Sequence, residues 1–328
     1  MTNSILTIRE KLKPFPRLYR SLLPTPVHRL DWLSDEYGVN VYCKRDDLTG
    51  FGFGGNKTRK LDFLLAEALD LGCDTLIATG ANQSNFCRMA AAYGVACRLD
   101  VHLVLGGRKP ATPTGNLCLD HLLGVSCHHV DSSDWDTWAK EAAKLEAELI
   151  SKSKKVYRMP VGGSTPRGAL GYVDAFAEII ADQSRLSVEF SAILHASSSA
   201  GTQAGLVVGQ AMAEWRTRII GISVAKPKTE QEKDVLNLAQ TTASEVDTQV
   251  DPMSIIVDDS YVGEGYAIRM PGCEEAVELF ARRMGIFLDY VYTGKAAAGL
   301  IDYLRKGRLD KDANVLFIHT GGNIELFE

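Results

Sequence analysis

Short apolar runs alternate with longer amphipathic segments along this chain. Five runs rich in β-branched residues are bounded mostly by Gly, Ser or Asn and predict buried strands. They cover residues 75–80, 101–107, 192–196, 219–224 and 315–319. Between them apolar residues recur every three or four positions, most clearly in 60–71 and 135–151, and this spacing predicts helices. The alternation indicates an α/β protein whose mostly parallel sheets are flanked by helices on both faces.

The chain is long enough for two lobes. It has 328 residues, of which 45% are hydrophobic, so it can bury more than one core. A charged segment at 151–155 (SKSKK) and a turn at 162–167 (GGSTPR) are candidate crossings between lobes. We therefore expect a two-lobed enzyme with a cleft.

Composition excludes several classes of partner and cofactor. The 36 basic and 41 acidic residues give a net charge of −5 without a long basic run, which disfavours nucleic acid. Seven cysteines without a C-x-x-C pair indicate reduced thiols in a cytoplasmic protein and no thiolate metal site. His128 and His129 are adjacent, so we expect a solvated loop there and no metal. No apolar run is long enough to cross a membrane.

A glycine cluster at 50–55 (GFGFGG) precedes Asn56 and Lys57. A phosphate-binding Walker loop needs glycine directly before the lysine, and Asn56 stands there. The dinucleotide fingerprint fails on spacing and also needs a preceding strand, and we predict none. What remains is a lysine on a flexible turn that could present its amine to a cleft, although a solvated lysine is the commoner outcome.

Two further polar clusters follow predicted strands. Residues 196–205 (ASSSAGTQAG) precede a helical stretch at 206–215 and could bind a phosphate group. Residues 80–88 (GANQSNFCR) could bind a carboxylate in the same way. Ordinary helix capping is the alternative for both clusters.

Other side chains are weaker candidates. The hydroxyl groups of Tyr292 and Thr293 could donate protons or hydrogen-bond to a ring nitrogen, but packing would also explain Tyr292. Cys87 is expected to be a buried thiol and not a reactive one. Trp135 and Trp138, three residues apart, predict one packed helix face and not a ligand cage.

Six motifs in order connect these pieces: GGNKTRKL (54–61), QSN (83–85), SSSAGTQAGL (197–206), YVGEGY (261–266), VYTGKAAAGLID (291–302) and HTGG (319–322). Over nearly the whole chain they resemble the pyridoxal-phosphate family of D-cysteine desulfhydrases and 1-aminocyclopropane-1-carboxylate deaminases. The resemblance implies pyridoxal 5'-phosphate as cofactor and a tryptophan-synthase β-like fold (PLP fold type II). It also implies that 1–56 and 166–328 form a larger cofactor-binding domain, into which 57–165 is inserted as a smaller one.

The resemblance also implies roles for individual residues. Lys57 would bind the cofactor covalently, and Ser84 would hold the substrate carboxylate. Further cofactor contacts would come from Asn85 to the ring hydroxyl, Thr320 to the pyridine nitrogen, and Ser199, Ala200, Gly201 and Thr202 to the phosphate. Tyr266 and Tyr292 would line the reacting side, and Gln83, Asn85 and Thr293 would join Ser84 around the substrate.

The activity implied is β-elimination from a small amino acid. The cyclopropane deaminases have glutamate where this chain has Thr293, which favours conversion of D-cysteine to pyruvate, ammonia and sulfide over ring opening. Phe86 replaces the usual histidine and Tyr290 the usual proline, so cysteate sulfo-lyase activity and the opposite enantiomer stay open. A non-catalytic cofactor-binding protein is the alternative of a different class. Members of this family are typically homodimers, so the resemblance also implies a homodimer.

Overall fold

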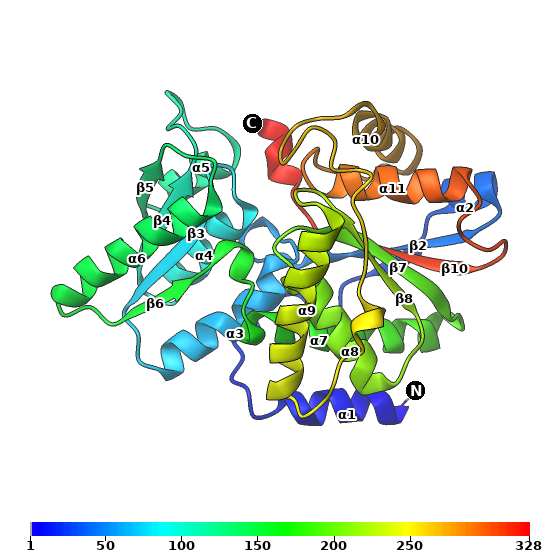
Figure 1. Ribbon diagram of the computed structural model, residues 1–328, viewed down its shortest axis with the longest axis horizontal. Coiled ribbons are helices and arrows are strands. Elements are labelled where there is room, and N and C mark those ends of the chain that lie inside the picture. Colours follow the sequence, from blue (N-terminus) through cyan, green and yellow to red (C-terminus); the bar gives the residue numbers. More distant parts are fainter. Residues whose placement is uncertain (1) are drawn as a thin grey trace.

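The computed structural model describes residues 2–328 and contains two sheets, one in each of two lobes (Figure 1). The larger sheet has the order β1-β2-β10-β7-β8-β9 and the smaller has the order β5-β4-β3-β6. All neighbouring strands are parallel except β1 and β2. The larger sheet comprises β1 Val27–Arg29, β2 Asn40–Arg45, β7 Phe190–Ser197, β8 Arg218–Ser223, β9 Ile256–Asp258 and β10 Asn314–His319. The smaller comprises β3 Thr75–Ala81, β4 Asp100–Gly106, β5 Ser126–Val130 and β6 Val156–Met159.

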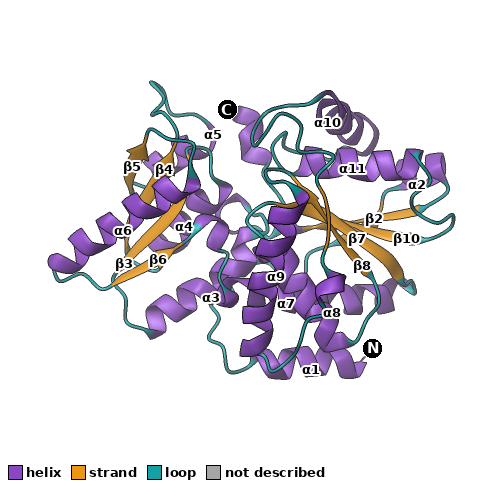
Figure 2. Cartoon of the chain, viewed as in Figure 1, coloured by secondary structure: helices purple, strands orange, loops and turns teal. Residues whose placement is uncertain are grey.

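Helices cover both faces of the larger sheet (Figure 2). One face packs against α1 Thr2–Leu12, α7 Pro166–Leu186, α8 Gly201–Ala213 and α9 Lys228–Glu245; the other packs against α2 Asp31–Tyr37, α10 Pro271–Met284 and α11 Thr293–Arg305. Strand β10 shows why both faces are apolar. Leu316 and Ile318 join the first core cluster, whereas Val315 and Phe317 join the second, because successive side chains of a strand point to opposite faces.

The smaller sheet is covered in the same way. On one face lie α3 Lys57–Asp70, α4 Asn85–Ala96 and α5 Gly115–Leu122, and on the other lies α6 Trp135–Ser151. Helix α3 also packs against α7 of the larger lobe. The residues at which the chain passes between the lobes therefore stay a prediction.

The structure confirms the five predicted strands and both predicted helices, with small shifts at their ends. Three predictions were wrong. Strand β2 precedes the glycine cluster, where no strand was expected, and His128 and His129 lie on strand β5 and not in a loop. The SKSKK segment joins α6 to β6 inside the smaller lobe, so it is not a crossing. Within residues 2–328 no helix is both long and apolar enough to span a membrane.

Candidate active site

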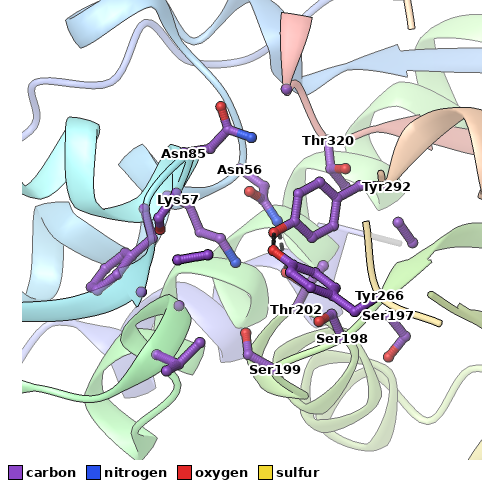
Figure 3. A pocket seen from close by; sticks show the side chains of 18 of the residues that line it. Asn56, Lys57, Asn85, Ser197, Ser198, Ser199, Thr202, Tyr266, Tyr292 and Thr320 are labelled. Atoms are coloured by element: carbon purple, nitrogen blue, oxygen red, sulfur yellow. Dashed lines mark hydrogen bonds between the residues drawn. The ribbon is translucent and has the colours of Figure 1, made fainter. Parts of the chain in front are cut away.

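A cavity between the lobes opens at the carboxyl ends of β3, β7 and β10, where parallel strands place the loops that bind ligands (Figure 3). The smaller lobe contributes Ser84, Asn85, Phe86, Trp135 and Trp138. The larger lobe contributes residues 196–200, Thr202, Tyr266, Tyr292 and residues 320–322, and Asn56 and Lys57 lie between these two sets. Sequence clusters far apart in the chain thus meet in one cavity.

Lys57 is the first residue of α3, and its amine points into this cavity (Figure 3). The turn before it is tightly held: Gly55 N donates to Thr49 Oγ1 at 2.8 Å, and Asn56 N donates to Thr320 O at 2.9 Å. Burial lowers the pKa of the Lys57 ammonium to about 8. The fraction of this amine that is unprotonated at neutral pH is therefore far larger than that of an ordinary lysine, and a nucleophile or base must be unprotonated.

Lys60 is a second buried amine that the sequence reasoning missed. It lies one helical turn after Lys57, its Nζ donates to Gly162 O at 3.2 Å, and burial with the neighbouring Lys57 lowers its pKa well below the ordinary value. The i, i+3 spacing in GGNKTRKL was the available signal, because such residues share a helix face. Within residues 2–328 no carboxylate forms an ion pair with either lysine.

The serine-rich turn lies against these amines. A methyl group added to Gly201 would lie 2.6 Å from Lys60 Nζ, so this amine adjoins the turn directly. Ala200 has φ +68°, and α8 begins at Gly201, earlier than the stretch at 206–215 predicted from sequence. Side chains fix the turn, because Ser164 Oγ donates to Ser199 Oγ at 2.9 Å and Asn56 Nδ2 donates to Thr202 Oγ1 at 3.0 Å. A helix N-terminus beside two amines that have no carboxylate partner within residues 2–328 fits an anionic group such as a phosphate.

Ser84 and Asn85 occupy the start of α4. Ser84 Oγ accepts a hydrogen bond from Cys87 N at 3.2 Å, so the capping alternative holds for this residue, which also faces the cavity. Asn85 Oδ1 accepts from Asn116 Nδ2 at 3.1 Å and from Arg88 Nη1 at 3.4 Å. These bonds fix the orientation of the Asn85 side-chain amide and leave its Nδ2 available as a hydrogen-bond donor.

Two tyrosines close the opposite side. Tyr266, from the loop before α10, and Tyr292, which precedes α11, share a short hydrogen bond between their hydroxyl groups (Figure 3). Burial raises the pKa of Tyr266 to about 12 and raises that of Tyr292 well above its usual range. Both phenols therefore keep their protons at neutral pH and can act as donors.

Two predicted substrate residues lie off the cavity wall. Thr293 is fully buried, and its hydroxyl donates to Asp289 Oδ1 at 2.5 Å. Gln83 Oε1 accepts from Asn116 N at 2.8 Å and thereby holds α5. Neither side chain faces the cavity, because a nearby backbone or carboxylate group already binds it.

The aromatic and thiol predictions had mixed outcomes. Trp135 and Trp138 do stack on one helix face, with ring centres 6.1 Å apart. They also line the cavity, where Trp135 meets Tyr266 edge to face, so packing is only part of their role. Cys87 is buried, and burial raises the pKa of its thiol, which confirms the unreactive interpretation.

Comparison with known proteins agrees with this geometry. Residues 19–321 match the family model described as "Pyridoxal-phosphate dependent enzyme", and the chain belongs to this family. Over 98% of both chains it is 40% identical to a D-cysteine desulfhydrase from Yersinia enterocolitica serotype O:8 / biotype 1B (strain NCTC 13174 / 8081). The predicted family and cofactor are thus confirmed.

Solved structures give the same result for the fold. A structure titled as an ACC deaminase homologue is 37% identical, with a TM-score of 0.92 over 98% of this chain and 96% of that one. Threonine deaminase isoform 2 from Solanum lycopersicum is 16% identical, with a TM-score of 0.69 over 98% of this chain and 85% of its own, and supports the fold alone. These neighbours confirm the predicted fold class, PLP fold type II.

Proposed function

We propose that this enzyme catalyses α,β-elimination on a small β-substituted amino acid, with D-cysteine converted to pyruvate, ammonia and sulfide. The observation that carries the proposal is that the Lys57 amine and the Tyr266–Tyr292 pair lie in one cavity, in a chain 40% identical to a D-cysteine desulfhydrase. A non-catalytic cofactor-binding protein would need the lysine but would not need the tyrosine pair.

The cavity fits pyridoxal phosphate. Its phosphate would lie at the serine-rich turn, residues 199–202, close to Lys60, because the start of α8 and a buried amine without a carboxylate partner within residues 2–328 can both donate to an anion there. Asn85 and Thr320 would contact the ring, and Lys57 would bind the coenzyme covalently. When bound, the coenzyme supplies an electron sink that makes the substrate Cα–H acidic.

The remaining work falls to side chains of this chain. Ser84, at the start of α4, would hold the substrate carboxylate with help from the N-terminus of that helix. Lys57 Nζ, released when substrate binds, would accept the proton from Cα. The Tyr292 hydroxyl would donate a proton toward the leaving sulfur, and Tyr266 would orient it through their shared hydrogen bond. Thr293 is bonded to Asp289 and presents no acid to the substrate, which supports elimination over ring opening.

Three finer proposals accompany this function. Residues 57–165 would form the smaller domain inserted into 1–56 and 166–328, which the two separate sheets support. The enzyme would act as a homodimer in the cytoplasm. Light scattering of the purified holoenzyme measures the oligomeric state, and fractionation of cells measures the location.

The decisive experiment replaces Lys57. In Lys57→Ala we expect no pyruvate from D-cysteine and no visible absorbance band of covalently bound coenzyme, because the amine proposed to bind the coenzyme is gone. The exposed Lys152→Ala serves as the matched control and should retain both. Turnover by Lys57→Ala would contradict the proposal. A wild-type enzyme that deaminates the cyclopropane acid but none of D-cysteine, L-cysteine, D-serine and cysteate would contradict it as well.

A further inference from the structure

Two carboxyl groups lie behind Tyr292. Asp289 belongs to the segment between α10 and α11, and Glu325 belongs to η5 (Asn323–Phe327), the short 3-10 helix at the C-terminal end that lies beside the larger lobe (Figure 1). Asp289 is 0% exposed and Glu325 is 8% exposed. Neither forms an ion pair with a basic side chain within residues 2–328, so charge neutralisation has to come from elsewhere.

Both carboxyl groups bind the backbone that carries Tyr292. Glu325 Oε2 accepts from Tyr290 N at 3.0 Å and from Val291 N at 3.3 Å. Asp289 Oδ2 accepts from the same Val291 N at 2.9 Å and from Tyr292 N at 2.6 Å. The N–H of Val291 is thus shared, and the two side chains converge on four consecutive residues, with Thr293 N completing the set through Asp289 Oδ1 at 2.9 Å.

The two carboxyl groups lie close together, because Asp289 Oδ2 and Glu325 Oε2 both accept from Val291 N, and a proton on one of them relieves the repulsion between them. Burial and the Asp289 charge raise the pKa of Glu325 to about 8. No carboxylate could approach another so closely in a buried site if both were ionised, because each charge disfavours the other.

The other titratable groups around the pair form no ion pair with it within residues 2–328. Tyr266, Tyr292 and Cys273 face it and are neutral, since their pKa values are raised. Lys295 on α11 is occupied by Val262 O and Gly265 O, and His319 on β10 has a lowered pKa. Helix α5, which packs against η5, carries Asp120 and His121, and neither acts on Glu325.

We propose that Asp289 and Glu325 share one proton and together position Tyr292 in the cavity, which makes Glu325 a positioning residue for the reaction. The C-terminal 3-10 helix then controls where the proton donor stands. The inference rests on the proposed function only in that Tyr292 acts on the substrate. Loss of the shared proton in alkaline solution places two negative charges under the Tyr292 backbone and displaces it.

The test compares three variants of the holoenzyme. Glu325→Gln keeps an acceptor for Tyr290 N and an N–H donor for Asp289 but cannot ionise. We expect the wild type to lose kcat above about pH 8, and we expect Glu325→Gln to retain wild-type kcat near pH 7 and to lack this decline. Glu325→Ala leaves a buried N–H unsatisfied and should lower kcat roughly tenfold at all pH values with little change in KM. Glu328→Gln, at an exposed glutamate three residues on, is the matched control.

A second measurement does not depend on turnover. The folded wild type holds a proton on Glu325 that the unfolded chain has lost above its ordinary pKa, so its thermal midpoint should fall between about pH 5 and 8 more steeply than that of Glu325→Gln. Equal slopes, or a Glu325→Gln enzyme that keeps the alkaline decline, would overturn the proposal. A difference in slope without any activity on D-cysteine would support the shared proton and contradict only the proposed substrate.

Discussion

The hydroxyl groups of Tyr266 and Tyr292 share a single hydrogen bond, so one of their two protons stays free to be donated into the cavity. Both phenols hold these protons at neutral pH because burial raises each pKa. The pair can therefore deliver one proton to a leaving group and still keep its geometry through the other. This is what elimination of a basic leaving group demands of the protein.

Replacing Tyr292 by Phe tests that role by leaving group. We expect Tyr292→Phe to lower kcat for D-cysteine by on the order of a hundredfold, because a general acid is lost. With β-chloro-D-alanine the loss should be much smaller, since chloride leaves without a proton. Pyruvate release measures both. An equal loss on the two substrates would show that the tyrosine only shapes the cavity.

How far single residues could be predicted depended on their chemistry. Lys57, Ser84 and the tyrosines carry reactive groups in motifs with a known order, and the structure brings them to one cavity. Thr293 has the same kind of hydroxyl, yet the buried carboxylate of Asp289, four residues earlier, binds it, and no sequence pattern shows that. The role proposed for Glu325 could not be predicted from sequence, because it depends on hydrogen bonds from Tyr290 N and Val291 N, 35 and 34 positions earlier.

At the scale of elements, the short 3-10 helix η3 (Val161–Gly163) brings the chain back toward Lys57. Gly162 has φ +70°, and a methyl group there would lie 2.2 Å from Ser199 Oγ and 3.2 Å from Lys57 Nζ. The turn thus needs glycine for two reasons, backbone conformation and close approach. Its motif predicted a turn from sequence, but the approach to Lys57 is visible only in three dimensions.

Gly162→Ala separates these two reasons when it is compared with Gly124→Ala. Gly124 has nearly the same φ, +71°, and nothing lies within 4 Å of an added methyl group. Both variants should lose about 1 kcal/mol of unfolding free energy to backbone strain. Only Gly162→Ala should also lower kcat, by on the order of a hundredfold, since Ser199 and the lysine are displaced. Denaturant unfolding measures the loss of stability, and pyruvate release measures kcat. Equal kcat values for Gly162→Ala and Gly124→Ala would refute the idea that a methyl group at Gly162 displaces Ser199 and Lys57.

The elements missed from sequence have a physical explanation. Strand β2 contains Lys44 and Arg45, which interrupt its apolar pattern, yet Lys44 is buried because Asp182 lies 2.9 Å away and Glu178 lies 3.2 Å away. Strand β5 is at the edge of its sheet and is only half-buried, so it lacks an apolar run. Hydrophobic patterning finds central strands that are buried on both faces, and it overlooks strands that neutralise charge or border solvent.

At the scale of the whole molecule, Trp135 joins the two lobes. It begins α6 of the smaller lobe, its ring centre lies 6.2 Å from that of Tyr266, and Lys226 Nζ lies 5.4 Å from its ring centre. Both partners belong to the larger lobe. Any change in the separation of the lobes must therefore change the surroundings of this indole.

Trp135 can therefore serve as an intrinsic fluorescence probe of the separation between the lobes. An ammonium group and a phenol beside an indole both alter its fluorescence, so emission should shift when D-serine or D-cysteine brings the lobes together. Stopped-flow measurement of tryptophan emission from the holoenzyme would follow the closing of the lobes in time. The same measurement on Trp135→Phe would give the signal of the chain's three other tryptophans, and the difference would be the contribution of Trp135. An unchanged record would mean that the lobes stay at a fixed separation throughout turnover.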